Sequence, residues 1–571
     1  MPEVPRTADP CTAADLVLLN GTVRTMDRAG TTRTVLAARG GRVLAVDDDA
    51  AVRGLIGPRT RVLDLRGRCA VPGFIETHNH PTFFGLTLAA DVDAGSPPNA
   101  TIADIAARVE QAAADAEPGT WVRGYRYDDT LLADDRHPTR ADLDPVSKDR
   151  PVCLQHVSGH FCVLNTAGLR LLGIDRNTPD PVGGAIHLDA AGEPDGVLAE
   201  TAAFAAYAAM PKPETADLAE AIGLAGDAYL AAGVTTVHDT GLGLVGGPAE
   251  LDAYRLARRK GRLRNRVRAY LVQDLFPGLS RGELSPVEAG VAGLGDDLFR
   301  VAGVKLWADG SLQGLTGCVS EGYACAPDKN GLLIFPQDDL ARRVATLHEA
   351  GWQVAIHGNG DAAIQAVLEA YAKLGLGPLE GDRRHRIEHC QMVSERQLDQ
   401  MAAAGILASF FIKHVYYWGD RHRDRFLGPE RARRIDPLAS AVKHGVTFGL
   451  HSDTPVVPVP PLEGIWCAVR RTTRDGHELG PEQRVDVDTA LRGYTSQAAH
   501  LGFEEREKGS LEPGKLADIA VLSADPGAVE ADAVRALQVD ATVIGGEVVW
   551  GGAGLDAVPD TGRAAGGGDG R

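Results

Sequence analysis

The feature that most constrains this chain is the alternation of two kinds of segment between residues 72 and 504. Short apolar, β-rich runs alternate there with Ala-rich amphipathic stretches such as residues 365–375 and 395–405. Strands and helices that alternate with short connections are typical of βα units around a parallel sheet. The runs that we expect to be strands include residues 234–239, 299–310, 352–358, 385–390, 405–411 and 446–453. The chain is therefore predicted to be an α/β protein.

Most of the expected strands end in a side chain that can bind a metal ion. The apolar run in GFIETHNHP ends in two histidines one residue apart, and residues i and i+2 of a strand point the same way. Functional side chains of a (β/α)8 barrel project from the C-terminal ends of its strands. The candidate residues, in chain order, are His78, His80, Lys305, His357, His389 and Asp453. The pattern predicts a TIM-like (β/α)8 barrel with one cluster of ligands at its mouth.

The spacing between these residues tests the prediction of a barrel. A barrel of ~250 residues allots about 31 residues to each βα unit. His357 and His389 are 32 residues apart, and His389 and Asp453 are 64 apart, which correspond to one and two units. Lys305 precedes His357 by 52 residues, which fits one unit with a long loop. His80 and Lys305 are 225 residues apart, too far for three units, so we expect an insertion over residues 95–215 after the first strand.

Both ends of the chain have a different texture from the middle. Residues 14–71 contain short β-rich runs separated by NG and GG dipeptides, and residues 505–552 show a similar pattern. Such dipeptides between β-rich runs are hairpin signals. We therefore predict one β-sandwich domain built from both termini, enclosing a barrel domain at residues 72–504. The tail, residues 553–571, is rich in Gly, Ala and Asp and is predicted to be disordered.

Charge and hydropathy exclude some classes of partner and predict a compartment. The net charge is −18, whereas binding to nucleic acid needs concentrated Lys and Arg. No apolar run approaches the ~18 residues of a membrane span. The N-terminal residues lack the basic start and apolar core of a signal peptide. We expect a cytoplasmic protein that acts on a small molecule and binds neither nucleic acid nor membrane; the sequence leaves a homo-oligomer open.

Two candidate ligands have specific alternatives. HGNGDAA follows a strand and opens a helix, so Gly358, Gly360 and Ala363 fit a dinucleotide-binding pattern. Asp361 argues against that interpretation, because it places negative charge where a pyrophosphate would sit. At the next strand either Glu388 or His389 could be the ligand, since period-two alternation lets only one of them face the interior.

Lys305 lies in the apolar run VAGVKLWA, where an unpaired ammonium group would be costly. A salt bridge to an acid such as Asp309 is the ordinary explanation. Asp453 could likewise merely cap the turn that follows it. Composition alone leaves both alternatives open.

Several longer motifs resemble those of a known family. VKLWADGSL, HGNGDAAI, RIEHCQM, HVYYWGD and GSLEPGKLADIAVL resemble the amidohydrolase superfamily, in particular its amidohydrolase-3 branch, which includes N-substituted formamide deformylases. The resemblance extends from about residue 15 to 550. It implies that all six candidate residues bind metal, with His389 rather than Glu388 as the ligand. It also implies two divalent cations, expected to be zinc, a carbamylated Lys305 that bridges them, and Asp453 as the general base on the shared water. A single ion beside an unmodified lysine is the alternative.

The resemblance also suggests residues that face the substrate. His160, in SGHFCVLNTAGL, belongs to the insertion, and its counterparts in relatives often face the pocket. The stretch HVYYWGD after the seventh strand offers His414, Tyr416, Tyr417 and Trp418, although an aromatic cluster can also be core packing. Asp309 and Arg386 are expected to support the ligands, and His451 to line the site.

The expected function is metal-dependent hydrolysis of a non-peptide C–N bond in a small amide, such as an N-substituted formamide. Cyclic amides and N-acyl amines are alternative substrates for the same site. Two alternatives come from other classes: a non-catalytic protein with the same fold and a dinucleotide-dependent oxidoreductase.

Overall fold

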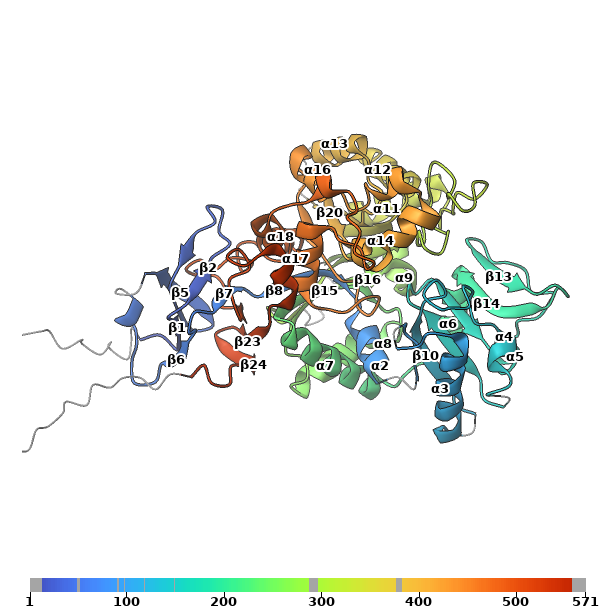
Figure 1. Cartoon of the computed structure of the whole chain (residues 1–571), viewed down its shortest axis with the longest axis horizontal. Helices are drawn as coiled ribbons and strands as arrows, with labels where there is room; N and C mark the ends of the chain where they lie inside the picture. The colour runs from blue at the N-terminus through green and yellow to red at the C-terminus, as the bar shows by residue number, and fades with distance from the viewer. Residues whose placement is uncertain are drawn as a thin grey trace, which may run out of the picture.

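The centre of the molecule is an eight-stranded parallel sheet that curls into a nearly closed barrel (Figure 1). The computed structural model describes residues 13–48, 52–89, 92–96, 98–117, 119–147, 149–286, 296–375 and 383–556. The strands follow one another around the barrel in chain order: β8 (Phe74–Asn79), β15 (Val234–Leu242), β16 (Arg266–Val272), β17 (Phe299–Trp307), β18 (Gln353–Gly358), β19 (Arg386–His389), β20 (Leu407–Phe410) and β21 (Phe448–Leu450). Across the closure, Thr77 of β8 donates a hydrogen bond to the carbonyl of Leu450 over 3.1 Å. The predicted barrel is confirmed.

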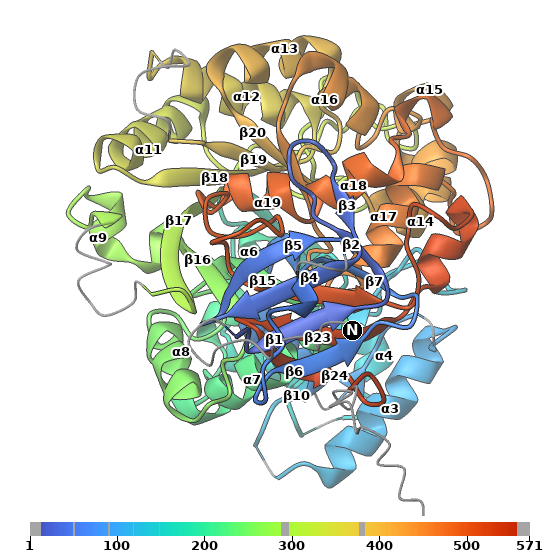
Figure 2. The ribbon, with the colours of Figure 1, turned by 90° about the vertical axis from the view of Figure 1, so that its left-hand side faces the viewer.

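Helices cover the outside of the barrel, as Figure 2 shows for the half of the ring that includes α11 and α13. The main covering helices are α7 (Thr215–Ala231), α8 (Ala249–Arg259), α11 (Gln337–Glu349), α12 (Asp361–Ala372), α13 (Glu395–Ala404) and α16 (Leu438–His444). Local signals delimit α13 at both ends. Ser394 and Gln397 form a capping box at its start, and Gly405 ends it with a φ of 66°.

Strand β16 was not among the runs named from the sequence, and arginines interrupt its apolar pattern. Arg266 and Arg268 are nevertheless buried. Arg266 donates to both carboxylate oxygens of Asp518, over 2.6 and 2.9 Å, and Arg268 donates to Glu504 over 2.6 Å. A guanidinium group can be buried at acceptable cost only with such partners. Both partners come from the segment that follows the barrel, more than 200 residues away in the chain.

The Arg268–Glu504 pair belongs to a buried cluster that also contains Lys508. The ammonium nitrogen of Lys508 lies 3.0 Å from Oε2 of Glu504. Burial disfavours the carboxylate of Glu504, but the charges of Lys508 and Arg268 outweigh it and lower the pKa of Glu504 to about 2. The ionised carboxylate therefore stabilises the attachment of the C-terminal segment to the barrel.

We expect Glu504→Gln to lower the melting temperature at neutral pH and to weaken its dependence on acid. Because the folded pKa lies below the ordinary value of 4.5, the carboxylate contributes its full stability above that value and loses it as the pH falls through about 2. Removing one partner of a buried ion pair costs about 3–5 kcal/mol. Melting curves over a series of pH values measure both effects. Glu507→Gln, at a side chain that is 45% exposed, is the control; an unchanged acid dependence in Glu504→Gln would contradict the assignment.

Both chain ends contribute to a β-sandwich at one end of the molecule (Figure 1). One sheet has the order β5-β4-β1-β6 and the other β24-β23-β22-β7-β2-β3. The strands are β1 (Leu16–Leu19), β2 (Thr22–Arg24), β3 (Thr32–Arg33), β4 (Val35–Arg39), β5 (Arg42–Asp47), β6 (Arg61–Asp64), β7 (Cys69–Pro72), β22 (Ile519–Leu522), β23 (Val539–Ile544) and β24 (Glu547–Gly551). Pairing of β7 with β22 joins the two ends, and Leu18, Leu36, Ile519 and Val543 share one core. The predicted sandwich from both termini is confirmed.

The sandwich core extends slightly beyond residue 552. Leu555 is buried in it, and Asp556 pairs with Arg61 over 2.8 Å. Residues 557–571, which make up most of the predicted disordered tail, lie outside the described residues.

The insertion folds as a separate six-stranded sheet at the opposite end of the molecule from the sandwich (Figure 1). Its order is β13-β14-β12-β11-β10-β9, with strands β9 (Val92–Asp93), β10 (Val122–Tyr127), β11 (Val152–His156), β12 (Phe161–Leu164), β13 (Gly184–Leu188) and β14 (Pro194–Glu200). Helix α3 (Ile102–Asp115) packs on it, and α6 (Thr201–Ala209) follows it. The separate sheet thus spans residues 92–200, between helix α2 (Pro81–Leu88) and α7.

Helices α2 and α7 approach so closely that the insertion leaves the barrel and returns to it at one place. A Cβ atom on Gly85 of α2 would lie only 1.8 Å from the carbonyl oxygen of Ala221 in α7. Only glycine fits at such a close helix–helix contact.

Within the described part of the chain, no helix has both the length and the apolar character needed to cross a membrane.

Candidate metal centre

The two histidines of β8 share one face at the barrel mouth and approach Asp453. The Nε2 atoms of His78 and His80 lie 3.5 and 3.1 Å from Oδ1 of Asp453, respectively. His78 is 1% exposed. Alternation along the strand places both side chains on the same side, as expected from the sequence.

Strands β17, β18 and β19 bring Lys305, His357 and His389 to the same end of the barrel, near His78. Lys305 ends near His78, with 3.3 Å between Nζ and Nε2. The ring centroids of His357 and His389 are 4.5 Å apart, and those of His78 and His389 are 4.7 Å apart. Ligand atoms of His78, His389 and Asp453 all lie within 4.8 Å of one another. The structure therefore gathers all six candidate ligands at one end of the barrel.

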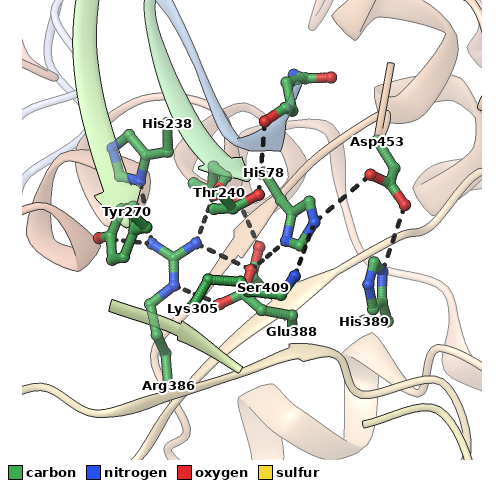
Figure 3. A network of polar contacts seen from close by, with 12 residues as sticks. His78, His238, Thr240, Tyr270, Lys305, Arg386, Glu388, His389, Ser409 and Asp453 are labelled. Atoms are coloured by element: carbon green, nitrogen blue, oxygen red, sulfur yellow. Dashed lines mark hydrogen bonds and ion pairs between the residues drawn. The ribbon is translucent and has the colours of Figure 1, made fainter. Parts of the chain in front are cut away.

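A buried network behind the cluster orients His78 (Figure 3). Oε2 of Glu388 lies 2.5 Å from Nδ1 of His78, and Arg386 donates to both oxygens of Glu388. A partner on one ring nitrogen fixes the tautomer and leaves the other nitrogen free to bind a metal. Arg386 is itself held by the carbonyl of Thr77 and by the hydroxyl of Tyr270. Glu388 thus orients the candidate ligand His78, and it is His389 that faces the cluster.

Burial favours the neutral form of three histidines in the cluster. It lowers the pKa values of His78, His357 and His389 well below the ordinary range, and the charge of Lys305 adds to the effect. For Asp453, burial favours the neutral acid, but the hydrogen bond from His80 and nearby positive charges lower its pKa to about 2. At neutral pH the cluster offers the neutral imidazole nitrogens of these three histidines and an ionised carboxylate.

These residues fit a transition-metal site. Neutral imidazoles and carboxylates are ligands of zinc and neighbouring divalent ions. Nδ1 of His389 is buried and has no hydrogen-bond partner among the described residues, and burying a polar nitrogen without a partner is costly. A cation would satisfy that nitrogen and balance the carboxylate of Asp453.

Asp453 is clamped from both sides by residues of β8. The backbone N–H and the hydroxyl of Ser452 each donate to Glu76 over 2.8 Å, and the N–H of Thr454 donates to Oδ1 of Asn79. Asp453 has a φ of 50°, a left-handed conformation that non-glycine residues rarely adopt without such support. Sequence reasoning missed Glu76 and Asn79. The available signal was that Glu76 shares the period-two face of His78 and His80.

The contacts of Asp309 and His451 bear on two of the expectations from the sequence. Asp309 does not pair with Lys305; it accepts hydrogen bonds from the backbone N–H groups of Cys318, Asn359 and Gly360, over 2.8, 3.0 and 2.8 Å, respectively. His451 lies directly against one of the candidate ligands. Its ring stacks on His78 at 4.8 Å, and neither ring nitrogen has a hydrogen-bond partner in the described part of the chain.

A cavity of about 170 Å³ opens directly onto the cluster. All six candidate ligands line it, and much of the remaining wall is apolar or aromatic: Phe83, Tyr125, Phe204, Tyr207, Met210, Leu244, Val245, Trp307 and Val456. The insertion supplies part of this wall, including the predicted residue His160. Nδ1 of His160 lies 2.7 Å from Glu200, and its ring centroid is 5.4 Å from that of His357. The cavity therefore combines a polar floor with an apolar wall.

The aromatic residues after the seventh strand lie elsewhere. Tyr416, Tyr417 and Trp418 belong to α14 (His414–Arg421) and line a second, neighbouring cavity rather than the first. His414, from the same helix, is buried against Phe411 at 4.1 Å between ring centroids and is not among the residues that line either cavity. The three aromatic residues thus line the second cavity, whereas His414 stays near the predicted ligand cluster, with its ring centroid 6.5 Å from that of His389.

Comparison with known proteins places the chain among hydrolases. A sequence model described as the amidohydrolase family matches residues 61–550. The N-substituted formamide deformylase of Arthrobacter pascens is 32% identical over 546 residues, covering 93% of this chain and 97% of that protein. Protein LONG AFTER FAR-RED 3 of Arabidopsis thaliana is 30% identical over 545 residues, covering 94% and 92%, respectively.

The solved structures include the same fold. An uncharacterized metal-dependent hydrolase from Pyrococcus horikoshii OT3 aligns with a TM-score of 0.71 at 24% identity. The alignment covers 90% of this chain and 99% of that one. The architecture of barrel, insertion and terminal β-domain therefore has a solved counterpart.

Proposed function

The chain belongs to the amidohydrolase family and is a metal-dependent hydrolase of C–N bonds, and from its site we propose that it cleaves small N-substituted amides, N-substituted formamides first among them. The observation that carries the proposal is an ionised, clamped Asp453 among neutral buried histidines, directly beside an apolar cavity. The family assignment replaces the two alternatives from other classes, the dinucleotide-dependent oxidoreductase and the non-catalytic protein.

We infer that two divalent cations, zinc by the chemistry of the ligands, are held by the residues of the cluster. The expected ligands are His78, His80, Lys305, His357, His389 and Asp453. Such ions supply Lewis acidity, which polarises a carbonyl group and lowers the pKa of a water molecule. The nitrogen-rich ligand set and the neutral state of His78, His357 and His389 support zinc over magnesium or calcium, which prefer oxygen ligands.

Lys305 is proposed to carry a carbamate. Only a neutral amine can attack CO₂, and burial lowers the pKa of Lys305 to about 8, so that a larger fraction is neutral at physiological pH than for an exposed lysine. The modified side chain would present a carboxylate among the histidines instead of an ammonium group. This exchange would replace a buried positive charge next to His78 by a metal ligand.

Asp453 is proposed as the general base. Its carboxylate accepts a proton from the attacking water, which adds to the amide carbonyl carbon, and it then passes the proton to the leaving nitrogen. The C–N bond breaks to give a carboxylic acid and an amine. The clamp from Glu76 and Asn79 supports this role, because it fixes the backbone on both sides of Asp453 and so positions the residue that carries the carboxylate.

The cavity indicates which part of the substrate varies. The scissile amide would lie on the polar floor, and the N-substituent against the apolar wall. About 170 Å³ leaves room for one small ring or a short alkyl group, given that a ~150 Å³ apolar cavity holds benzene. The name of the Arthrobacter relative supports a formyl group on the carbonyl side. Cyclic amides and N-acyl amines remain the alternative substrates.

Substrate panels test this proposal. Zinc-loaded protein is assayed with N-formyl, N-acetyl and N-benzoyl derivatives of the same small amines, together with cyclic amides, and the appearance of new amine groups is measured, which covers both amine release and ring opening. We expect the highest kcat/KM for a formyl compound with a small apolar N-substituent. A preference for bulky acyl groups or for cyclic amides would replace the formamide assignment by one of the alternatives, and no release from any amide would overturn the proposal.

A further inference from the structure

A second cavity, of about 280 Å³, lies where the insertion, helix α14 and the C-terminal segment meet. Its lining includes four arginines, Arg126, Arg421, Arg474 and Arg535, but only one acidic residue, Asp128. This is a local excess of positive charge in a chain whose net charge is −18. We propose that this cavity binds a small organic oxyanion, a carboxylate or a phosphate ester on a flat apolar body.

Two of the four arginines are already paired and shape the cavity. Arg126, from the insertion, contacts Asp93 over 2.7 Å. Arg535, from the 3₁₀ helix η4 (Ala531–Ala536), pairs with Glu463 over 2.9 Å and stacks on the ring of Tyr416 at 4.3 Å. These contacts fix the two side chains in place, so the charge available to a ligand comes mainly from the other two.

Arg421 has hydrogen-bonding capacity that the described protein groups do not use. Its Nη1 atom is buried and has no hydrogen-bond partner in the described part of the chain. The nearby acid, Asp128, is 3.9 Å away, which is too long for a hydrogen bond. The carboxylate of Asp128 is instead occupied by Thr130 at 2.6 Å and by the indole N–H of Trp418 at 3.1 Å. A buried donor in this state calls for a ligand, ion or water.

The guanidinium group of Arg474 lies near that of Arg421, and an anion between the two positive charges would be favourable. Burial lowers the pKa of Arg421. The charge of Arg474 lowers it further, although the carboxylates nearby, Asp128, Asp129 and Asp420, oppose the effect. An oxyanion between two guanidinium groups accepts charge-assisted hydrogen bonds from both and cancels their repulsion. The hydroxyl of Ser96, which also belongs to the lining, is likewise buried without a partner among the described residues. It is a further donor for the same ligand.

The remaining walls indicate that the anion has an organic body. Tyr416, Tyr417 and Trp418 present aromatic surface, and Leu131, Val157 and Val456 add apolar surface. A cavity of this volume exceeds the ~150 Å³ that encloses benzene, so it accommodates a ring together with an oxyanion. This assignment gives the aromatic residues of α14 a role outside the metal centre.

The cavity is separate from the metal centre. None of the six candidate metal ligands lines it, and of its lining residues only Val456 also lines the first cavity. The proposal therefore does not depend on the amide chemistry.

Calorimetric titration of the full-length protein with phenyl phosphate, benzoate and inorganic phosphate tests the proposal. We expect saturable binding of at least one aromatic oxyanion, stronger than that of inorganic phosphate. Arg474→Gln, at an exposed side chain, should weaken this binding by about tenfold, and Arg421→Gln by at least as much, since each removes charged hydrogen bonds to the ligand.

Arg423→Gln is the matched control. Arg423 lies two residues from Arg421, pairs with Asp424 and does not line the cavity, so binding should be unchanged. Because Arg474 does not line the first cavity either, weakening by Arg474→Gln separates this site from an anion bound at the metal centre. The proposal is overturned if none of the three probes binds saturably, or if Arg474→Gln and Arg421→Gln bind as tightly as the unchanged protein.

Discussion

Asp453→Asn is expected to lower kcat/KM for the best amide substrate by about a thousandfold. Asparagine keeps the shape of the side chain but cannot accept the proton of the attacking water. The clamp that holds residue 453 uses the backbone of Ser452 and Thr454 and not the carboxylate itself, so the fold around the site should persist. Steady-state kinetics with a formamide substrate, together with a melting curve, measures the two effects separately.

The metal content of the variant distinguishes two causes of the loss. If Asp453→Asn keeps its metal and loses activity, the carboxylate acts as the base; if it loses metal as well, its main role is that of a ligand. Asp361→Asn is a suitable control, because Asp361 holds the backbone of Ser320 near the same end of the barrel and does not line the cavity. Activity of Asp453→Asn equal to that of the control would refute the proposed role of Asp453.

Exhaustive chelation is expected to abolish activity, and added zinc to restore it. All six candidate ligands meet at one point of the barrel, and the proposal requires about two ions per chain there. Elemental analysis of the reloaded protein gives the stoichiometry. The melting temperature should also rise on reloading, because ions that bind only the folded state stabilise it. Full activity in protein shown to be free of metal would exclude the mechanism.

The variant Lys305→Ala tests whether Lys305 is needed to hold two ions. If Lys305 carries a carbamate that bridges two ions, the variant should bind fewer ions per chain, and added short carboxylic acids should partly restore binding. Mass spectrometry of the intact protein can detect the added CO₂ directly. An unmodified lysine, with one ion per chain in both proteins, would favour the mononuclear alternative.

The prediction from the sequence was most successful where the signal was local. Strands that end beside His357 and His389 and shortly before Asp453 were expected from apolar runs, and the spacing of 32 and 64 residues matched whole βα units. Helix α13 likewise carries its own start and end signals, from Ser394 to Gly405. Such features depend on residues within one turn or one strand, so they can be predicted without knowing which distant residues they contact.

The failures involve long-range partners. Strand β16 was not among the named runs. Arg266 and Arg268 resemble surface residues until Asp518 and Glu504 are placed beside them. Tyr416, Tyr417 and Trp418 were predicted to face the substrate because they follow a barrel strand, and α14 places them in the second cavity, beside the insertion. In each case the deciding contact joins segments far apart in the chain.

The sequence by itself determined the barrel, the position of the insertion, the shared β-sandwich and the identity of the candidate ligands. Those properties follow from hydrophobic periodicity, from spacing and from motifs, all of which are written along the chain. Only the tertiary structure decided that Glu388 orients His78, that Glu76 and Asn79 clamp Asp453, and that a second cavity gathers four arginines. These arrangements depend on distances between side chains from different strands and domains, which are set when the barrel closes and the insertion packs against it.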